Sequence, residues 1–237
     1  TKNYIDFQFL HLGENFVREI SPRFEDHKDV RFFPDQWQYD VIQRIKQDKS
    51  ALVVAPTSTG KTFISFYTIT RVLEKTKGEP KQKTTDSGMK ARIVFVAPST
   101  PLVNQMGANI YKRYKGENVT FGLFTSEYRE NVENCDILVC TPQVLFILLI
   151  APASQQWASR LQYVIFDEIH CIGTETDGSS LRACYAKSLA FVPCPFLALS
   201  ATVQNPSKLQ SWLETVTCQE VALLPKTPIQ PWNDIQR

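Results

Sequence analysis

The chain has 237 residues, of which 43% are hydrophobic and 21% charged, so it can bury a sizeable core as one large α/β domain, with or without extensions. Its 26 basic and 24 acidic residues leave a net charge of +2, which excludes a globally basic nucleic-acid binder and makes any such binding local. Its six cysteines form no Cys-x-x-Cys pair and no tight group with histidine, which predicts no zinc site and favours reduced thiols in the cytoplasm.

The first part of the chain, residues 1–33, is rich in aromatic side chains, and we expect it to be a lead-in that packs on the next domain. No signal sequence is visible there. The longest apolar run, residues 144–151, has eight residues. A membrane span needs about 20, so a buried helix is predicted instead. The chain opens without methionine and ends without a terminating pattern, which suggests a fragment.

A helix is predicted from residue 34 to about 47, because apolar residues recur there at helical spacing. Gln38 lies in this helix, just upstream of an apolar strand. Its amide can both donate and accept hydrogen bonds, which suits the edge of an adenine ring. A plain polar surface residue is the alternative interpretation of Gln38.

The next stretch has the pattern of a phosphate-binding loop. An apolar strand at 51–54 is followed by the small-residue loop 55–62 and then by a helical pattern. Free backbone N–H groups and the positive dipole end of a helix meet at such a loop. Gly60 allows the backbone to curl around a phosphate, Lys61 supplies charge, and the Thr62 hydroxyl suits Mg²⁺. The expected nucleotide-binding residues of the loop are Thr57, Ser58, Thr59, Gly60, Lys61 and Thr62.

Six further apolar runs complete a set of seven predicted strands. A polar, aperiodic segment at 75–90 is predicted to be an exposed loop, and the prolines of 225–237 predict a linker that leaves the domain. The domain between lead-in and linker is therefore expected to span 34–224. Strands alternate with helical patterns, which predicts a mainly parallel sheet with helices on both faces. The seven predicted strands are 51–54, 92–97, 119–124, 136–140, 162–167, 196–199 and 220–224.

Two of these strands end in polar side chains that complement the loop. Asp167 and Glu168 close one strand, and this pair is what Mg²⁺–ATP chemistry needs. Asp167 can hold the metal through water, and Glu168 can orient or deprotonate the attacking water. His170 is placed to face the γ-phosphate side, with a satisfied core histidine as the alternative. Another strand ends at Ser200, whose hydroxyl, with that of Thr202 two residues on, could bond the acidic loop and report nucleotide state.

This ordered set resembles the first RecA-like motor lobe of the superfamily 2 DExD/H-box (DExH box) helicases. Within them it is similar to the superkiller (Ski-like) branch, and most to the large interferon-linked antiviral RNA helicases and their fungal relatives. The resemblance implies a P-loop RecA-like fold, ATP and Mg²⁺ as cofactors, and an ATP hydrolase acting in antiviral RNA handling. The matching residues are Gln38 (Q motif), 55–62 (motif I), 97–105 (Ia), Thr125 and Ser126 (Ib), 141–143 (Ic), 167–170 (II) and 200–202 (III).

The resemblance further implies that motifs Ia, Ib and Ic contact the phosphate backbone of single-stranded RNA. Thr100 stands where motif Ia usually carries Lys or Arg, and Gln143 stands where motif Ic usually ends in Glu. No Gln-x-x-Gly-Arg-x-Gly-Arg stretch occurs, so the arginine finger and the second lobe are expected elsewhere, and the isolated lobe is expected to turn over little ATP. The implied RNA contacts are Pro98, Ser99, Thr100, Thr125, Thr141, Pro142 and Gln143.

Two other classes of function stay open at this point. One is a P-loop ATPase that acts on DNA or on protein complexes, because the residues alone do not distinguish RNA from DNA. The other is an idle lobe kept as an interaction platform. The presence of Lys61, Thr62, Asp167 and Glu168 together favours a working motor over the platform.

Overall fold

The computed structural model of the chain describes residues 34–56, 59–78, 92–152, 155–172 and 179–225. The predicted lead-in (1–33), most of the predicted loop and nearly all of the predicted linker lie outside these ranges. Within them, no helix has both the length and the apolar character needed to cross a membrane.

Eight strands form one sheet in the order β4-β3-β5-β2-β6-β7-β1-β8. All neighbouring strands run parallel except β3 and β4, which pair antiparallel. The seven predicted strands are confirmed, and β4 is a short edge strand that the sequence analysis missed. The strands are β1 (Ser50–Val54), β2 (Arg92–Val96), β3 (Phe121–Phe124), β4 (Arg129–Glu130), β5 (Ile137–Cys140), β6 (Leu161–Phe166), β7 (Phe196–Ser200) and β8 (Val221–Leu224).

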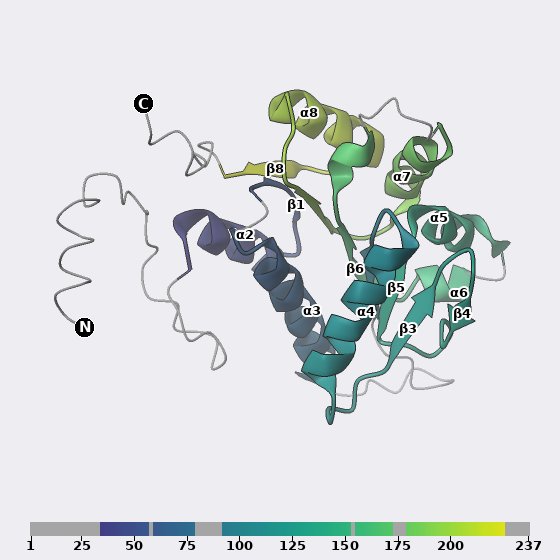
Figure 1. Cartoon of the computed structure of the whole chain (residues 1–237). Coiled ribbons are helices and arrows are strands. Elements are labelled where there is room, and N and C mark those ends of the chain that lie inside the picture. The colour runs from purple at the N-terminus through teal and green to yellow at the C-terminus, as the bar shows by residue number, and fades with distance from the viewer. Residues whose placement is uncertain (1–33, 57–58, 79–91, 153–154, 173–178, 226–237) are drawn as a thin grey trace, which may run out of the picture.

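Helices cover both faces of the sheet, as predicted (Figure 1). Apolar side chains of α2, α3 and α4 share one core with alternate strand residues, and those of α5, α7 and α8 share a second core with the others. In β1, for example, Ala51 and Val53 belong to the first core and Leu52 to the second. The helices are α2 (Gln36–Lys46), α3 (Lys61–Gly78), α4 (Thr100–Tyr114), α5 (Pro142–Ile150), α6 (Gln155–Ala158), the 3₁₀ turn η3 (Ile169–Ile172), α7 (Ser179–Phe191) and α8 (Pro206–Thr217).

This double burial explains why the inner strands of the sheet are largely apolar instead of alternating between apolar and polar residues. A parallel sheet needs crossover connections, and the helices that supply them cover both of its faces. The carboxyl ends of the parallel strands therefore share one edge, where the loops that follow them gather.

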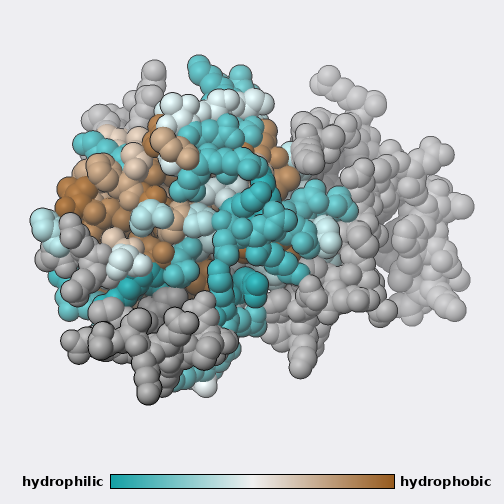
Figure 2. Space-filling view, turned by 180° about the vertical axis from the view of Figure 1, so that it is seen from behind, coloured by the Kyte–Doolittle hydropathy of each residue, from teal (hydrophilic) through white to brown (hydrophobic). Residues whose placement is uncertain are grey.

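Two predictions are wrong in detail: where α3 ends, and how deeply α5 is buried. Helix α3 continues to Gly78, so residues 75–78, which were predicted to belong to a loop, are helical. Helix α5 was expected to be buried, but Ile147 is 55% and Ile150 is 49% exposed, because the helix packs only one side against the sheet and α7. Figure 2 shows hydrophobic surface on the side of the molecule that α5 and α7 cover.

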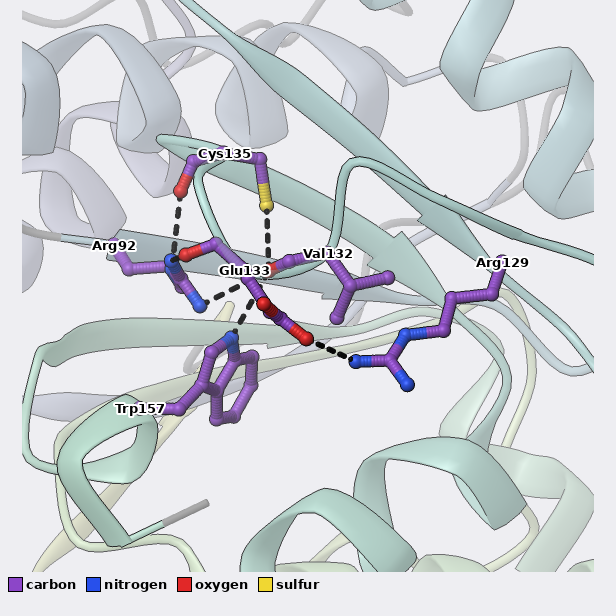
Figure 3. A network of polar contacts seen from close by, with 6 residues as sticks. All are labelled: Arg92, Arg129, Val132, Glu133, Cys135 and Trp157. Atoms are coloured by element: carbon purple, nitrogen blue, oxygen red, sulfur yellow. Dashed lines mark hydrogen bonds and ion pairs between the residues drawn. The ribbon is translucent and has the colours of Figure 1, made fainter. Parts of the chain in front are cut away.

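The first residue of β2 anchors the connection between β4 and β5 (Figure 3). The guanidinium of Arg92 is buried and donates to the carbonyl oxygens of Cys135 at 3.0 Å, Val132 at 3.2 Å and Glu133 at 2.5 Å. It also lies 5.1 Å from the ring centroid of Trp157, whose Nε1 donates to the Val132 carbonyl. These bonds satisfy carbonyl groups of residues 132–135, and they hold the connection between β4 and β5 against the start of β2.

Candidate ATP site at the carboxyl edge of the sheet

The predicted site motifs meet at the carboxyl edge of the sheet. The backbone N–H of Ala55, after β1, donates to the carbonyl of Ser200, at the end of β7, at 3.0 Å. The N–H of Asp167, after β6, donates to the carbonyl of Val96, at the end of β2, at 2.9 Å. Residues far apart in the sequence thus become neighbours because their strands are neighbours.

Gly60 and Gln38 shape the phosphate-binding loop. Gly60 has a φ of +95°, and a Cβ there would lie 2.7 Å from Nε2 of Gln38, so only glycine fits. The Nε2 of Gln38 donates to the carbonyl of Thr59 at 2.9 Å, and its Oε1 accepts from the N–H of Asp35 at 3.0 Å. Gln38 therefore ties α2 to the loop, while its role toward an adenine stays a prediction. Thr57 and Ser58 lie outside the described residues.

Lys61 opens α3 with a charge that the described part of the chain leaves unsatisfied. The side chain is buried, and its Nζ has no hydrogen-bond partner among the described residues. Burial lowers the pKa of Lys61, and the carboxylates of Glu168 and Asp167 partly offset that effect. A buried ammonium without a partner is costly, so this position is built for an anionic ligand.

Lys61 faces a cavity of about 130 Å³ that it shares with the acidic pair. The Thr62 hydroxyl and the Asp167 carboxylate both line it, and such hard oxygen donors are the ligands that Mg²⁺ prefers. The donor chemistry therefore fits a magnesium ion that enters with a nucleotide and keeps several waters. The cavity is lined by Lys61, Thr62, Ser65, Phe95, Met106, Asp167, Glu168 and Leu199.

The pKa of Asp167 is raised by its surroundings in the site. Burial raises the pKa of its carboxyl to about 6, and the neighbouring Glu168 charge adds to the increase. The N–H of Glu168, which donates to Asp167 Oδ1, and the charge of Lys61 act in the opposite direction. Without ligands, Asp167 is thus held in an environment that disfavours its charge, and a bound cation would relieve this.

We expect Asp167→Asn to stabilise the protein, in the absence of nucleotide and metal, by about 2–3 kcal/mol at pH 7 and by little at pH 4. Because the folded-state pKa of Asp167 is raised to about 6, the folded protein binds more protons than the unfolded chain as the pH rises from about 4 to 6. The free energy of unfolding therefore falls across this window and stays lowered above it. Urea unfolding in EDTA at both pH values measures the difference. An equal effect of the substitution at pH 4 and pH 7 would contradict it.

Glu168 follows Asp167 in an unusual backbone conformation. Its φ is +49°, in the left-handed region that a non-glycine residue rarely occupies. Its Oε2 is buried, accepts no hydrogen bond from the described residues, and lies 3.2 Å from Nδ1 of His170. Glu168 also lines the cavity, where a group that orients a water has to lie.

Ser200 connects the acidic loop with the phosphate-binding loop. Its Oγ lies 3.2 Å from Nδ1 of His170 and donates to the carbonyl of Thr202 at 3.2 Å. Its own carbonyl accepts from Ala55. The expected bond from Ser200 to the acidic loop is therefore present, through His170, whereas Thr202 contributes its carbonyl. The roles of His170 at the γ-phosphate and of Ser200 and Thr202 in coupling stay predictions.

The residues predicted to contact RNA lie on the same edge with unequal exposure. Pro98, Ser99 and Thr100 are half-exposed at the start of α4. Thr125 is buried, and its Oγ1 accepts from the N–H groups of Glu127 and Tyr128 at 3.2 and 3.4 Å, so its hydroxyl closes a turn. The same turn exposes the Ser126 side chain.

The residues of motif Ic, 141–143, lie at the start of α5. Thr141 is the N-cap residue and is buried, as is Pro142, whereas Gln143 is half-exposed. The carbonyl of Pro142 accepts a bond of 3.0 Å from Oγ of Ser188, on α7. Whether these three residues contact RNA stays a prediction.

Tyr185 is the residue of the site that the sequence analysis missed. It lies on α7, and its hydroxyl donates to the carbonyl of Asp167 at 2.8 Å. Nothing in the spacing of the motifs points to it, because a lone tyrosine on an apolar helix face is usually a core residue. Only the packing of α7 against η3 brings it to the acidic pair.

Comparison with known proteins gives one consistent family. A model of the DEAD/DEAH box helicase family matches residues 35–209. The chain is 36% identical over 218 residues to a probable ATP-dependent RNA helicase DDX60-like of Homo sapiens, covering 89% of this chain and 12% of that protein. It is 28% identical over 180 residues to the ATP-dependent DNA helicase Hel308 of Methanococcus vannielii, covering 74% of this chain and 22% of that protein.

A solved structure is similar in fold. The helicase MrfA bound to DNA and AMPPNP superimposes with a TM-score of 0.67 at 16% identity, over 88% of this chain and 30% of that one. This likeness supports the arrangement of the sheet and its helices. The chain spans only 12% of the length of the relatives from Homo sapiens, Caenorhabditis elegans and Dictyostelium discoideum that it matches.

Proposed function

The chain belongs to the DEAD/DEAH box helicase family, and from this we propose that it is the ATP-binding, first RecA-like lobe of an ATP-dependent RNA helicase. In this proposal, hydrolysis of Mg²⁺–ATP at the carboxyl edge is coupled to binding of, or translocation along, single-stranded RNA. The proposal concerns the whole protein, of which this chain is one lobe.

One observation carries the nucleotide part of the proposal. Nζ of Lys61 is buried without a hydrogen-bond partner among the described residues, and it faces the cavity that Thr62, Asp167 and Glu168 also line. An anion beside Lys61 and a cation beside Asp167 would remove both unfavourable charges together. Mg²⁺–triphosphate is a ligand that brings an anion and a cation into one site together.

The roles of the side chains follow from their positions. Lys61 binds the outer phosphates, and Thr62 with Asp167 holds the metal ion, which neutralises charge on those phosphates when bound. Glu168, which lines the cavity, holds the attacking water through its carboxylate and takes a proton from it. His170 and Ser200 link this carboxylate to the end of β7. The arginines that complete such a site are proposed to come from a second RecA-like lobe.

RNA is the proposed nucleic acid because the name of the 36% identical relative describes an RNA helicase. The relative Hel308, at 28% identity, is named as a DNA helicase, so DNA is the competing substrate. An antiviral role and a cytoplasmic location belong to the same proposal. Both are supported by the resemblance described above, and the location also by the six cysteines, which lie among the described residues and form no disulfide there.

The experiment that tests the proposed function is ATP hydrolysis by the full-length protein, measured alone and with single-stranded RNA or DNA of the same sequence. Stimulation by RNA beyond that by DNA is expected. Equal or greater stimulation by DNA would assign the motor to DNA. Binding of ATP with no hydrolysis in any condition would favour an idle platform.

A further inference from the structure

The peptide group between Asp167 and Glu168 is held at both of its polar atoms. Its carbonyl oxygen, which belongs to Asp167, accepts a hydrogen bond of 2.8 Å from the hydroxyl of Tyr185. Its N–H, which belongs to Glu168, donates to Oδ1 of Asp167 at 3.0 Å. The two bonds pull on opposite ends of one planar unit, so together they fix the rotation of that plane.

Rotation of this plane decides where the Glu168 carboxylate lies. Glu168 has a φ of +49°, a conformation that is unfavourable for a non-glycine residue and persists only where surrounding contacts enforce it. If the plane turned, φ would relax toward negative values and the carboxylate would leave its place beside His170, 3.2 Å away. The bond from Tyr185 opposes that relaxation.

The surroundings of Tyr185 keep its hydroxyl in place beside the Asp167 carbonyl. It is fully buried on α7, and its ring centroid lies 6.2 Å from that of Phe166, the residue before Asp167. Burial raises the pKa of Tyr185 well above its ordinary value, so its hydroxyl stays a donor. One turn further along α7, Ser188 Oγ donates to the carbonyl of Pro142, which fastens the helix to the start of α5.

We propose that Tyr185 is a positioning residue for ATP hydrolysis: by holding the Asp167 carbonyl, it keeps Glu168 in its left-handed conformation with the carboxylate at the cavity. The proposal rests on the proposed function, since it concerns the same reaction. It assigns Tyr185 an effect on the chemical step, and none on the affinity for ATP.

The chain supplies a matched control in Tyr163. This tyrosine is also buried, and its hydroxyl also donates to a backbone carbonyl, that of Lys49, at 3.0 Å. Lys49 precedes β1, so the bond lies at the amino edge of the sheet, opposite the site. Tyr163→Phe and Tyr185→Phe therefore remove the same oxygen from similar surroundings, and a purely structural role predicts the same result for both.

The test compares these two variants in the full-length protein with RNA present. Tyr185→Phe is expected to lower kcat by about 3- to 10-fold, the effect of one hydrogen bond of ordinary strength, while the Kd for ATP stays unchanged. Tyr163→Phe is expected to keep both values, although urea unfolding should show a similar loss of stability. Equal kcat values for the two variants would overturn the proposal, as would a Tyr185→Phe protein that fails to fold where Tyr163→Phe folds.

A double-mutant cycle with Glu168→Gln shows whether Tyr185 acts through Glu168. In that background the carboxylate is gone, so removing the Tyr185 hydroxyl should lower kcat no further. A further loss equal to that in the wild type would overturn the proposal. A wild-type protein that hydrolyses no ATP would instead contradict the proposed function itself, so the two failures are distinguishable.

Discussion

Replacing Glu168 by glutamine is expected to slow ATP hydrolysis by about 10²–10⁴-fold while leaving ATP binding nearly unchanged. In the proposed mechanism the carboxylate acts mainly in the transition state, when the water loses its proton, so its loss should affect kcat more than affinity. Glutamine keeps the shape of the side chain. The full-length protein with RNA is the material for the measurement, because the isolated lobe is expected to turn over little ATP even as the wild type.

The controls for this prediction are chosen to separate chemistry from structure. ATP affinity by calorimetry should agree between wild type and Glu168→Gln, and the variant should hold ATP and RNA together for longer. Glu127 offers an exposed carboxylate on the same edge of the sheet, and Glu127→Gln should leave kcat unchanged. Comparable turnover by wild type and Glu168→Gln would show that Glu168 only caps the turn after β6.

Replacing Lys61 by alanine is expected to weaken ATP binding by about 1.5–3 kcal/mol, because it removes a charge-assisted contact to phosphate. This corresponds to a roughly 10- to 150-fold higher Kd. Nζ of Lys61 has no partner among the described residues, so its removal breaks no hydrogen bond that the structure shows. The variant should therefore fold as the wild type does.

Calorimetric titration with Mg²⁺–ATP measures this change in the 237-residue chain or in the full-length protein. Lys112→Ala removes an exposed lysine of α4 with the same change in net charge, and it should leave the Kd within a factor of about two, as screened surface charges do. An unchanged Kd for Lys61→Ala would mean that the loop after β1 does not bind phosphate.

Stability and function oppose each other at this edge of the sheet. Three features disfavour the folded state without ligand: the Lys61 ammonium, which has no partner among the described residues, the raised pKa of Asp167 and the left-handed backbone of Glu168. In the proposed function, binding of a magnesium nucleotide would offset the cost of the Lys61 and Asp167 charges and make use of the position of Glu168. Unfavourable features that cluster at one edge of an otherwise well-packed sheet are typical of a ligand-binding site, where function is kept at a cost in stability.

The sequence alone predicted the class of fold, which is confirmed, and the residues of the proposed nucleotide site, whose roles stay predictions. Seven strands were predicted because a parallel sheet with both faces covered needs largely apolar strands, and apolar runs can be recognised directly in the sequence. The phosphate-binding loop and Asp167 with Glu168 were predicted because their chemistry depends on residues that are adjacent in the chain. The local conformation of such residues follows from short-range sterics, and Gly60 is an example.

The tertiary structure decided everything that depends on residues distant in sequence. The two-residue strand β4 was missed because only its pairing with β3 makes it a strand. Gln38 proved to hold the loop through Thr59, and Thr125 to close its own turn, because hydrogen-bond partners are set by packing. Tyr185 lies 18 residues after Asp167 and reaches it only because α7 packs beside η3. A sequence shows which side chains can act, but the sheet order determines which of them meet.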